Sequence, residues 1–330
     1  MPKVSVIIPV YGVEKYIERC ATSLFEQTLY DIEYIFVNDC TKDNSMKVLA
    51  DVITRYPDRK SQIRIINLSI NEGLPSARRH GLSLASGEYI IHCDSDDWVE
   101  IDMYKSMYDK AIETGSDIVV CDYNKSESIS NFKYINQSIP LEKNKFINGL
   151  LDGTVPGFVV NKLVKASLYN NVQYFPKDNF TEDMVITTQL VYYAEHICHI
   201  EKGFYHYFTN SESITQKSID AYHALKMGKQ CFNNFNIIYK FLSCQPDFAD
   251  FASNITLRKY RIKLFLRNIC RSKGGFKRWR SIFPELSPFS VFKYHLPWRT
   301  KIGYIITCMG IYSCLSTLDK SRVDAIMIED

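Results

Sequence analysis

The chain has 330 residues, of which 46% are hydrophobic and 23% charged, with a formal net charge of +3 at pH 7. This balance is typical of a globular protein and excludes disordered, collagen-like and low-complexity chains. The length suits one enlarged domain or two, and fourteen Gly and eleven Pro are too few for long linkers.

The first 125 residues alternate between short β-branched runs and helix-length stretches. We expect strands at residues 4–9, 34–38, 63–67, 89–93 and 118–121. We expect helices at residues 14–27, 44–56, 74–85 and 101–113. Asp43 and Asn44 are candidate caps for the second helix, and Gly115 is a stop signal for the fourth. The strand runs lack polar alternation, which indicates burial on both faces. This part therefore predicts a mostly parallel sheet covered by helices.

The alternation breaks near residue 126. The later pattern favours an antiparallel excursion at 131–138, a short helix at 142–151, strands at 158–164 and 203–208, and a helix at 182–194. After residue 214 strand signals become rare. Residues 221–242 and 248–270 have the pattern of long helices, and Gly274-Gly275 is a break. We therefore expect an α/β fold with a sheet-based domain at 1–215 and a helical region at 216–330.

The ten cysteines form no C-x-x-C pair, which argues against a metal cluster. Residues 4–9 follow Met1-Pro2-Lys3 directly and have the pattern of a strand rather than of a signal peptide. Buried thiols in a reducing cytosol are therefore the expected state of these cysteines.

Positive charge is concentrated near the C-terminus. Thirteen Lys or Arg and one acid, Glu285, lie between Arg258 and Lys301, so this segment carries +12 and the remainder of the chain −9. Residues 302–318 carry no charge but are too short and too diluted by small residues to span a bilayer comfortably. We expect residues 258–318 to attach to an anionic membrane face. The alternative is that a C-terminal helix packs onto the sheet-based domain. Nucleic-acid binding has no supporting motif and is not expected.

Polar side chains follow several predicted strands at the point where each strand ends. The first strand leads into Pro9-Val10-Tyr11, the second into Asp39, and the fourth into Asp94-Ser95-Asp96-Asp97. In an open parallel sheet, ligands bind outside the carboxyl ends of the strands. Clustered acids repel one another unless a cation or a hydrogen-bonding ligand neutralises them, and their oxygens suit Mg²⁺ or Mn²⁺. The sequence thus favours a metal-bound diphosphate; the alternative is a solvated acidic turn that caps the next helix.

Three phosphate-binding or nucleophile motifs are missing. The sequence contains no G-x-G-x-x-G after the first strand, no G-x-x-x-x-G-K-[ST] and no G-x-S-x-G. These absences argue against a dinucleotide-binding fold, a P-loop ATPase and a nucleophile elbow. Phosphates would then be held by a metal and an arginine.

Several motifs, in order along residues 3–215, resemble family 2 glycosyltransferases of the GT-A fold. The matching segments are residues 4–11 with Glu14, residues 37–39, residues 71–75 with Arg78, residues 94–97, and residues 161–163 followed by Glu182-Asp183. The run at 94–97 is similar to the D-x-D signature of that family, and Glu182-Asp183 to its E-D motif. One such motif is weak, whereas five in the expected order are a specific signal.

The resemblance implies roles for individual residues. The donor site would comprise Pro9, Val10, Tyr11, Glu14, Asp39, Arg78, Asp94, Ser95 and Asp96. The first three would line the nucleotide base, and Asp39 would accept a hydrogen bond from a uracil ring. Arg78 would meet the nucleotide, and Asp94 the ribose or the sugar.

The same resemblance implies a metal and a base. Asp96 would bind Mn²⁺ or Mg²⁺ on the diphosphate, and the run leaves two registers open for the metal, Asp94 with Asp96 or Asp96 with Asp97. Asp183 would be the general base that deprotonates the acceptor hydroxyl. The implied reaction is a single displacement with inversion at the anomeric carbon.

The resemblance thus implies a hexosyltransferase that uses a nucleotide sugar, most simply a UDP-sugar. Residues 1–125 would bind the donor, and residues 126–215 the acceptor. The acceptor is expected to be a growing glycan or lipid-linked saccharide of a surface polysaccharide. We expect the protein in the cytoplasm, peripheral to the inner face of the plasma membrane.

Two alternatives remain open. A nucleotidylyltransferase shares a related sheet and metal use, but it should carry a Gly-rich basic loop after the first strand, where this chain has Tyr11-Gly12-Val13-Glu14. A degenerate sugar-binding or assembly module would keep the fold without turnover. The presence of Asp39, Asp94, Asp96 and Asp183 argues against such a module.

Overall fold

The computed structural model of the chain describes residues 1–209, 220–314 and 318–328. Its contacts separate two compact units, Met1–Ile147 with Val155–Ser213, and Asn148–Thr154 with Ile214–Asp330. The boundary expected near residue 215 falls within 210–219, outside the described residues, and stays a prediction. None of the described helices is long and apolar enough to cross a membrane.

The first unit is built on one sheet, with nine strands in the described part of the chain. The strands are β1 (Val4–Val10), β2 (Ile32–Asn38), β3 (Ile63–Asn67), β4 (Tyr89–His92), β5 (Trp98–Val99), β6 (Ile118–Ser126), β7 (Phe132–Ile135), β8 (Lys162–Lys165) and β9 (Ile197–Phe208). Their order in the sheet is β3-β2-β1-β4-β8-β6-β9-β5, and β7 pairs with β6. The helices of this unit are α1 (Ile17–Phe25), α2 (Ser45–Arg55), α3 (Leu74–Leu84), α4 (Met103–Thr114) and α6 (Glu182–Tyr193), with 3₁₀ turns η1 (Pro57–Gln62) and η2 (Ala166–Asn171). Helix α5 (Lys143–Asp152) begins in the first unit, and its residues from Asn148 on belong to the second.

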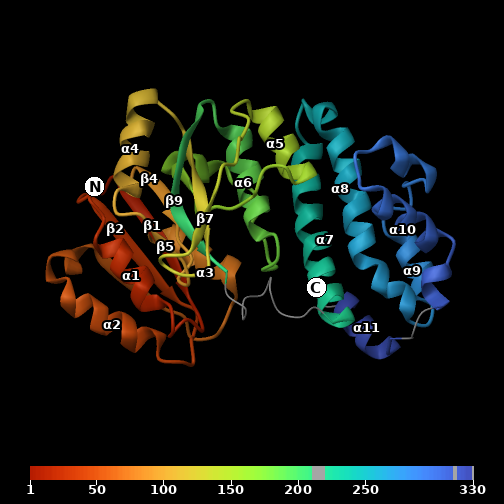
Figure 1. The fold of residues 1–330 in the computed structure, drawn as a ribbon, viewed down its shortest axis with the longest axis horizontal. Coiled ribbons are helices and arrows are strands. Elements are labelled where there is room, and N and C mark those ends of the chain that lie inside the picture. The colour runs from red at the N-terminus through yellow and green to blue at the C-terminus, as the bar shows by residue number, and fades with distance from the viewer. Residues whose placement is uncertain (210–219, 315–317, 329–330) are drawn as a thin grey trace. The chain divides into compact units, whose positions relative to one another are not determined.

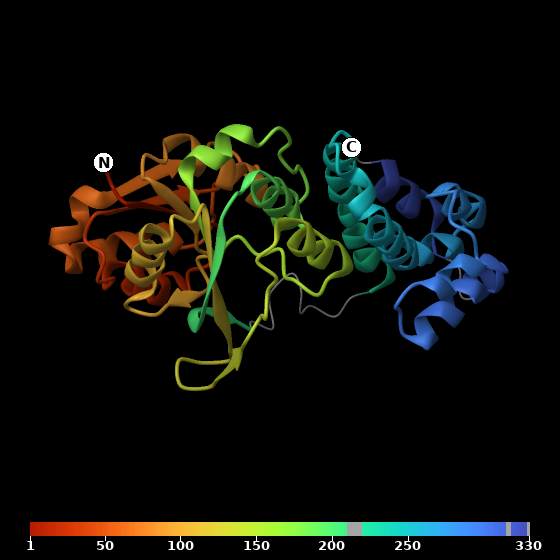
Figure 2. The same ribbon diagram turned by 90° about the horizontal axis from the view of Figure 1, so that it is seen from above.

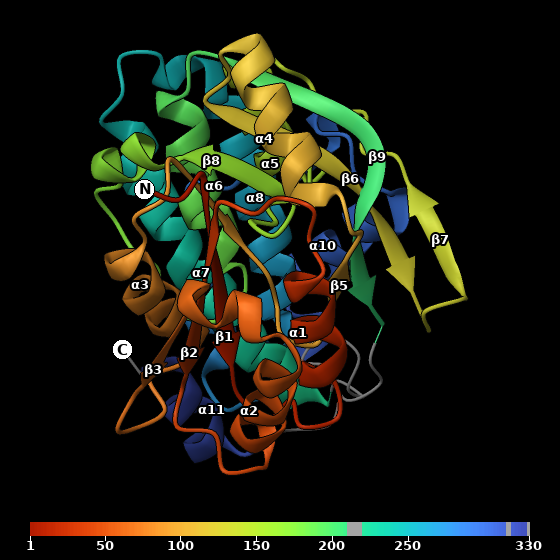
Figure 3. The same ribbon diagram turned by 90° about the vertical axis from the view of Figure 1, so that its left-hand side faces the viewer.

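The strands β3, β2, β1 and β4 are parallel neighbours, and β1 is buried along its whole length. The chain passes through α1 and α2 toward the β3 edge and returns through α3 to β4. Because such crossovers are right-handed, α1 and α2 cover one face of the sheet and α3 covers the other. Figures 1 and 3 show this arrangement. It brings the carboxyl ends of β1, β2 and β4 to one edge.

Beyond β4 the sheet is mixed. Strand β8 is antiparallel to β4 and β6, whereas β9 is parallel to β6. The expected excursion at 131–138 is confirmed by β7, which forms with β6 a hairpin that extends from the sheet in Figure 2. The strand expected at 158–164 is largely wrong, since pairing is confined to β8 and the preceding residues form a turn. The strand expected at 203–208 begins already at Ile197, because polar residues on its half-exposed first half hide the pattern.

The second unit is helical. Its helices are α7 (Ala221–Ser243), α8 (Ala252–Phe265), α9 (Gly275–Ser281), α10 (Trp298–Cys308) and α11 (Lys320–Ile328), with 3₁₀ turns η3 (Phe248–Phe251), η4 (Leu266–Arg271), η5 (Phe289–Lys293) and η6 (Ile311–Cys314). Helices α7 and α8 run side by side (Figure 1). The predicted α/β fold followed by a helical region is thereby confirmed.

The single helix expected at 248–270 is wrong, because it is divided into η3, α8 and η4. Trp279 Nε1 donates to the Lys263 carbonyl at 2.7 Å. In a continued α-helix that carbonyl would accept from residue 267. Packing of α9 therefore ends α8 where the sequence pattern would continue it.

Part of the expected cationic surface is used inside the second unit. Lys259 Nζ lies 2.7 Å from Glu285 Oε1, and Lys263 Nζ lies 4.9 Å from the centre of the Trp279 ring. Burial lowers the pKa of Lys263. Residues 302–318, of which 315–317 lie outside the described residues, contribute to α10 and η6.

Close packing of α3 depends on Gly81. A Cβ atom built on Gly81 would lie 2.4 Å from Ile7 Cγ2 and 3.3 Å from Val37 Cγ2. Val37 also forms a buried cluster with Ile35 and Ala77. The missing side chain thus lets the helix that carries Arg78 approach β1 closely.

We predict that Gly81→Ala lowers the free energy of unfolding by about 1–2 kcal/mol, because overpacking of so close a contact costs about 2–3 kcal/mol and the gain in helix propensity is about 1 kcal/mol. Urea unfolding measures the change. Ser83→Ala, at an exposed position of the same helix, is the control and should change the stability by no more than about 0.5 kcal/mol. Equal stability of Gly81→Ala and the wild type would contradict the close approach.

Candidate active site

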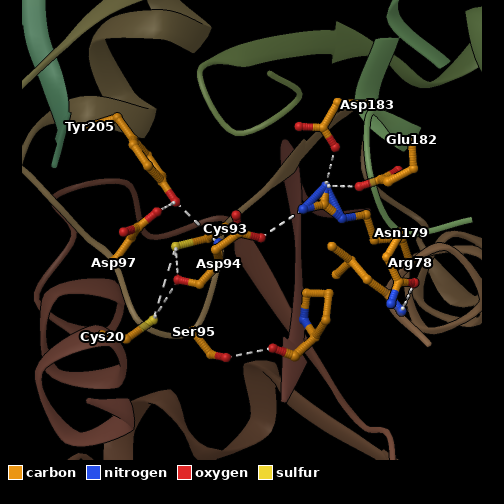
Figure 4. Close-up of polar contacts among 12 residues, drawn as sticks. Cys20, Arg78, Cys93, Asp94, Ser95, Asp97, Asn179, Glu182, Asp183 and Tyr205 are labelled. Carbon is orange, nitrogen blue, oxygen red and sulfur yellow. Dashed lines mark hydrogen bonds and ion pairs between the residues drawn. The ribbon is translucent and has the colours of Figure 1, made fainter. Parts of the chain in front are cut away.

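Polar turns from three strands meet at the carboxyl edge of the sheet. The acidic run, residues 94–97, begins two residues after the end of β4. Ser95 Oγ donates to the Pro9 carbonyl at 2.6 Å, which fixes the acidic run to the end of β1 (Figure 4). The backbone N–H of Asp39 donates to the Val10 carbonyl at 3.0 Å, which fixes the end of β2 to the same place.

One buried guanidinium lies between the acidic run and the start of α6. Arg78 on α3 is 6% exposed. Its Nη2 donates to Asp94 Oδ1 at 2.7 Å, and its Nη1 donates to Asp183 Oδ1 at 3.3 Å. The same Nη1 forms an ion pair with Glu182 Oε1 at 3.2 Å (Figure 4). Arg78 thus brings together Asp94 and Asp183, two predicted site acids that are far apart in the sequence.

The charges of this cluster are strongly coupled. Burial lowers the pKa of Arg78, but the carboxylates of Glu182, Asp94 and Asp183 outweigh burial and raise it, so the guanidinium stays charged. Burial raises the pKa of Glu182 and of Asp94, and Arg78 opposes both shifts. Three carboxylates around one guanidinium leave an excess of negative charge when they are ionised. That excess favours binding of a further cation.

Asp97, the last acid of the run, is directed into the fold. The Tyr205 hydroxyl donates to Asp97 Oδ2 at 2.5 Å, and the backbone N–H of Phe208 donates to Oδ1 at 2.7 Å. Burial raises the pKa of Asp97, and the neighbouring acids of the run add to the shift. Both carboxylate oxygens of Asp97 therefore have protein partners, and the register of the metal site stays a prediction.

Asp96 suits the role of a cation ligand. Among the described residues its carboxylate forms no ion pair, and burial together with the charge of Asp94 raises its pKa to about 6. Arg19 Nη2 donates to the Asp96 carbonyl at 2.6 Å, and the guanidinium stacks 3.9 Å from the centre of the Trp98 ring. The backbone of the run is therefore held while the Asp96 carboxylate keeps its capacity to bind.

No three His, Cys, Asp or Glu side chains converge into a ready-made metal cage in the part of the chain that the structure describes. Mg²⁺ and Mn²⁺ do not require such a cage, since they retain waters and take oxygens from a bound phosphate. The carboxylate oxygens of Asp94 and Asp96 therefore fit a divalent cation that shares its coordination with a ligand.

The acids Glu182 and Asp183 form the first turn of α6. Thr181, just before them, has a φ of +65°, a left-handed conformation that is uncommon for a β-branched residue and is often found at functional sites. The Asp183 side chain is 25% exposed, whereas that of Glu182 is 3% exposed. Asp183 is therefore the more accessible carboxylate of the pair, and its role as the base stays a prediction.

Asp39, predicted to bind a uracil ring, holds the loop before α3. Its two carboxylate oxygens accept from the backbone N–H groups of Glu72 and Gly73, at 2.7 and 2.9 Å. Each carboxylate oxygen can accept more than one hydrogen bond. The contact with uracil stays a prediction and would use the remaining capacity.

The other predicted donor residues surround the end of β1. Pro9 and Val10 are buried in the strand, and Tyr11 is 52% exposed just beyond it. Glu14 Oε2 accepts from the Asn44 backbone N–H at 2.9 Å, at the start of α2. Tyr11 thus offers a free face to a ligand, whereas Glu14 supports the turn behind it.

Two residues without a role in the sequence analysis support the site. The Tyr205 hydroxyl accepts from the Asp94 backbone N–H at 3.2 Å while it donates to Asp97. Lys162 Nζ donates to the Phe158 carbonyl at 2.6 Å, and burial lowers the pKa of Lys162 to about 7 against the opposing charge of Asp183. Lys162 belongs to the motif at 161–163, but nothing in the sequence indicates that its side chain is buried. The sequence does not indicate a role for Tyr205, because its partners Asp94 and Asp97 are more than a hundred residues away in the chain.

Comparison with known proteins identifies the family. The profile of Glycosyl transferase family 2 matches residues 5–171. An uncharacterized glycosyltransferase of Bacillus subtilis, EpsJ, is 31% identical over 289 residues, which cover 84% of this chain and 81% of that protein. The chain therefore belongs to glycosyl transferase family 2, as its motifs indicate.

Solved structures share the fold at low sequence identity. Residues 1–349 of S. aureus TarS, in complex with UDP-GlcNAc, have a TM-score of 0.55 and 16% identity, covering 94% of this chain and 91% of that one. The mannosyltransferase PcManGT from Pyrobaculum calidifontis, in complex with GDP-Man and Mn²⁺, has a TM-score of 0.57 and 13% identity, covering 95% and 87%. The expected GT-A fold is thus confirmed.

We predict that Arg78→Met lowers the free energy of unfolding by about 3–5 kcal/mol near neutral pH, because it leaves buried carboxylates without their cation. Without Arg78 the pKa of Glu182, already raised by burial, rises further, so the folded variant takes up protons as the pH falls. The loss of stability should therefore shrink between about pH 8 and pH 5.

Urea unfolding over this pH range measures the effect. Arg79→Met, at the exposed next position of α3, is the matched control and should cost no more than about 1 kcal/mol, since Arg79 contributes only an exposed stacking contact with Phe175. A small loss for Arg78→Met, or one that grows as the pH falls, would contradict the assigned charge balance.

Proposed function

We propose that this chain is an inverting glycosyltransferase that moves a sugar, most simply a hexose, from a UDP-linked donor to a saccharide or lipid-linked acceptor in cell-surface polysaccharide synthesis. The observation that carries the proposal is the guanidinium of Arg78, which lies 2.7 Å from Asp94 and 3.3 Å from Asp183. An acid of the D-x-D run and a solvent-accessible carboxylate therefore share one site. Direct displacement requires both, one toward the leaving diphosphate and one toward the acceptor.

In the proposed reaction Asp183 accepts the proton of the acceptor hydroxyl while the hydroxyl oxygen attacks the anomeric carbon of the donor sugar. The bond between that carbon and the diphosphate breaks on the opposite side, UDP leaves, and the configuration inverts. Arg78 holds Asp183 in position, and the partial exposure of the Asp183 carboxylate gives the acceptor access to it.

Asp96 and Asp94 are the residues that would hold Mn²⁺ or Mg²⁺. Such a cation supplies positive charge that stabilises a diphosphate leaving group. We assign Asp97 to the scaffold instead, because Tyr205 and the backbone of Phe208 occupy its oxygens. The Mn²⁺ complex of PcManGT, a protein with the same fold, supports a divalent cation in this class.

We assign Pro9, Val10 and Tyr11 to the nucleotide base and Asp39 to the uracil ring. The position of these residues at the carboxyl ends of β1 and β2, beside the acidic run, supports the assignment. The UDP-GlcNAc complex of TarS supports a UDP-sugar donor. Glu14 and Ser95 would act through the turns that they fix rather than by contact with the nucleotide.

The remaining parts of the chain complete the proposal. Residues 1–125 would bind the donor, residues 126–215 would form the acceptor side, and residues 216–330 would hold the protein at the cytoplasmic face of the plasma membrane. The excess positive charge of residues 258–301 supports the membrane contact, since the cytoplasmic leaflet is anionic.

Asp183→Asn should lower the rate of UDP release from a UDP-sugar by about 10²–10⁴-fold and leave UDP binding unchanged, because an amide oxygen is too weak a base for the proton. A panel of UDP-sugars with the wild type finds the donor, and calorimetry measures binding. Asp109→Asn, on the exposed surface of α4, is the matched control and should keep full activity.

The outcomes separate the alternatives. Full activity of Asp183→Asn would remove Asp183 as the base. A wild type that binds UDP but turns over no UDP-sugar with saccharide or lipid-linked acceptors would indicate a degenerate module. Release of pyrophosphate from a nucleoside triphosphate and a sugar phosphate would indicate a nucleotidylyltransferase.

A further inference from the structure

Large apolar side chains face solvent in one short stretch of the second unit. The exposed side chains are Phe289, Phe292, Trp298, Ile302, Ile306, Met309 and Ile311. Elsewhere among the described residues of this unit, Tyr239 is the single large apolar side chain exposed to this degree. Soluble surfaces scatter such residues singly, so a cluster on adjoining elements indicates a contact surface.

Helix α10 carries the centre of this cluster with its apolar stripe turned outward. Trp298, Ile302 and Ile306 follow one another at intervals of four residues, which places them on one side of the helix. Tyr304 and Thr307, on the other side, are fully buried. A helix that only packs on its own domain shows the reverse pattern, with polar residues outward.

The 3₁₀ turn η5 extends the stripe. Phe289 and Phe292 on η5 are 75% and 55% exposed. Lys301 Nζ of α10 lies 3.4 Å from the Phe292 carbonyl and 5.9 Å from the centre of the Phe292 ring. Since α10 and η5 are thus in direct contact, their exposed side chains form one surface, which we call the α10 face.

The segment that carries the α10 face contains bases and no acids. Residues 286–318 contain Lys293, Arg299 and Lys301 and no Asp or Glu. Arg267 is also exposed, and its Nη1 lies 4.0 Å from the position that a Cβ atom on Gly303 of α10 would occupy. The preceding acid, Glu285, is already paired with Lys259. The face is therefore apolar at its centre and positively charged at its border.

We propose that the α10 face docks into an anionic phospholipid bilayer, with α10 lying in the plane of the interface. The outward stripe would enter the boundary between headgroups and acyl chains, and Lys293, Arg299 and Arg267 would contact anionic headgroups. This membrane contact would serve the proposed transfer to a lipid-linked acceptor, and only its biological purpose rests on that proposed function. Lipid binding itself is measured without any turnover of a donor.

The length of α10 and the charge around it favour peripheral binding to a bilayer over a membrane-spanning helix or a second copy of this chain. Eleven residues of helix are about 16 Å long, which is too short to cross a hydrocarbon core of about 30 Å. A second copy of this chain would bring the same bases against each other, and like charges disfavour such a contact. An interface that is both apolar and bordered by Trp, Lys and Arg matches the boundary of an anionic membrane.

Trp298 offers a direct readout. The chain has three Trp, of which Trp98 is 7% exposed, Trp279 1% and Trp298 67%. Vesicles of phosphatidylcholine with about 30% phosphatidylglycerol should shift the emission of the full chain to the blue, and brominated lipids should quench it. Trp298→Phe should abolish both effects. A shift of equal size in Trp298→Phe would place the contact elsewhere and overturn the proposal.

Vesicle flotation tests the surface as a whole. Ile302→Asn with Ile306→Asn, and Lys293→Glu with Arg299→Glu, should each weaken binding by at least about tenfold, through loss of apolar burial and of headgroup attraction. Ile112→Asn is the matched control, since Ile112 is an isoleucine on α4 that is at least as exposed as Ile302 and Ile306, and this variant should bind as the wild type does. Vesicles of phosphatidylcholine alone should bind the wild type weakly.

Thermal unfolding and UDP binding confirm that each variant is folded, because none of these residues lies in the candidate active site. Equal vesicle binding by all variants, or no binding by the wild type, would overturn the proposal. Loss of a dimer in Ile302→Asn with Ile306→Asn, without any vesicle binding by the wild type, would assign the face to a second copy. Loss of UDP-sugar turnover with lipid binding intact would count against the proposed function alone.

Discussion

A guanidinium that is 6% exposed must keep its carboxylate partners, because water cannot replace them. The partners of Arg78 come from two elements, Asp94 after β4 and the pair Glu182-Asp183 at the start of α6. The helix α3 that carries Arg78 is itself held against β1 through the close contact at Gly81. The ion cluster around Arg78 therefore fixes the acidic run and the proposed base relative to each other. The geometry of the candidate active site depends on this cluster.

The parts of the fold that sequence predicts well are those with local causes. Buried strands and intervening helices in the first 125 residues follow from hydrophobic runs and turn signals, so the parallel half of the sheet was predictable. The proposed choice of Asp94 rather than Asp97 as the partner of Asp96 at the metal was not, because it depends on Tyr205 and Phe208, which reach Asp97 from β9. The division of residues 248–270 was equally hidden, since the Trp279 indole that takes the Lys263 carbonyl belongs to the next helix.

The charge that faces outward also depends on distant contacts, and a count of charged residues in the sequence does not give it. The sequence gives residues 258–301 a charge of +12, which predicts a basic surface. In the folded unit Lys259 is paired and Lys263 is buried, so the count overstates the charge that faces outward. What sequence alone did not indicate is the outward apolar stripe of α10, since periodicity places Trp298 and Ile302 on one face but does not tell whether that face is covered. The proposed membrane contact therefore depends on the exposed stripe together with the bases that border it, and not on the charge count alone.

The central claim is that the acidic run after β4 is a cation-dependent site for the donor diphosphate. Calorimetric titration of UDP with and without Mn²⁺, on the wild type and on Asp96→Asn, tests it most directly. We expect Mn²⁺ to strengthen UDP binding to the wild type by at least about tenfold and to have no such effect on Asp96→Asn. Equal UDP binding by both proteins, unaffected by Mn²⁺, would contradict the account.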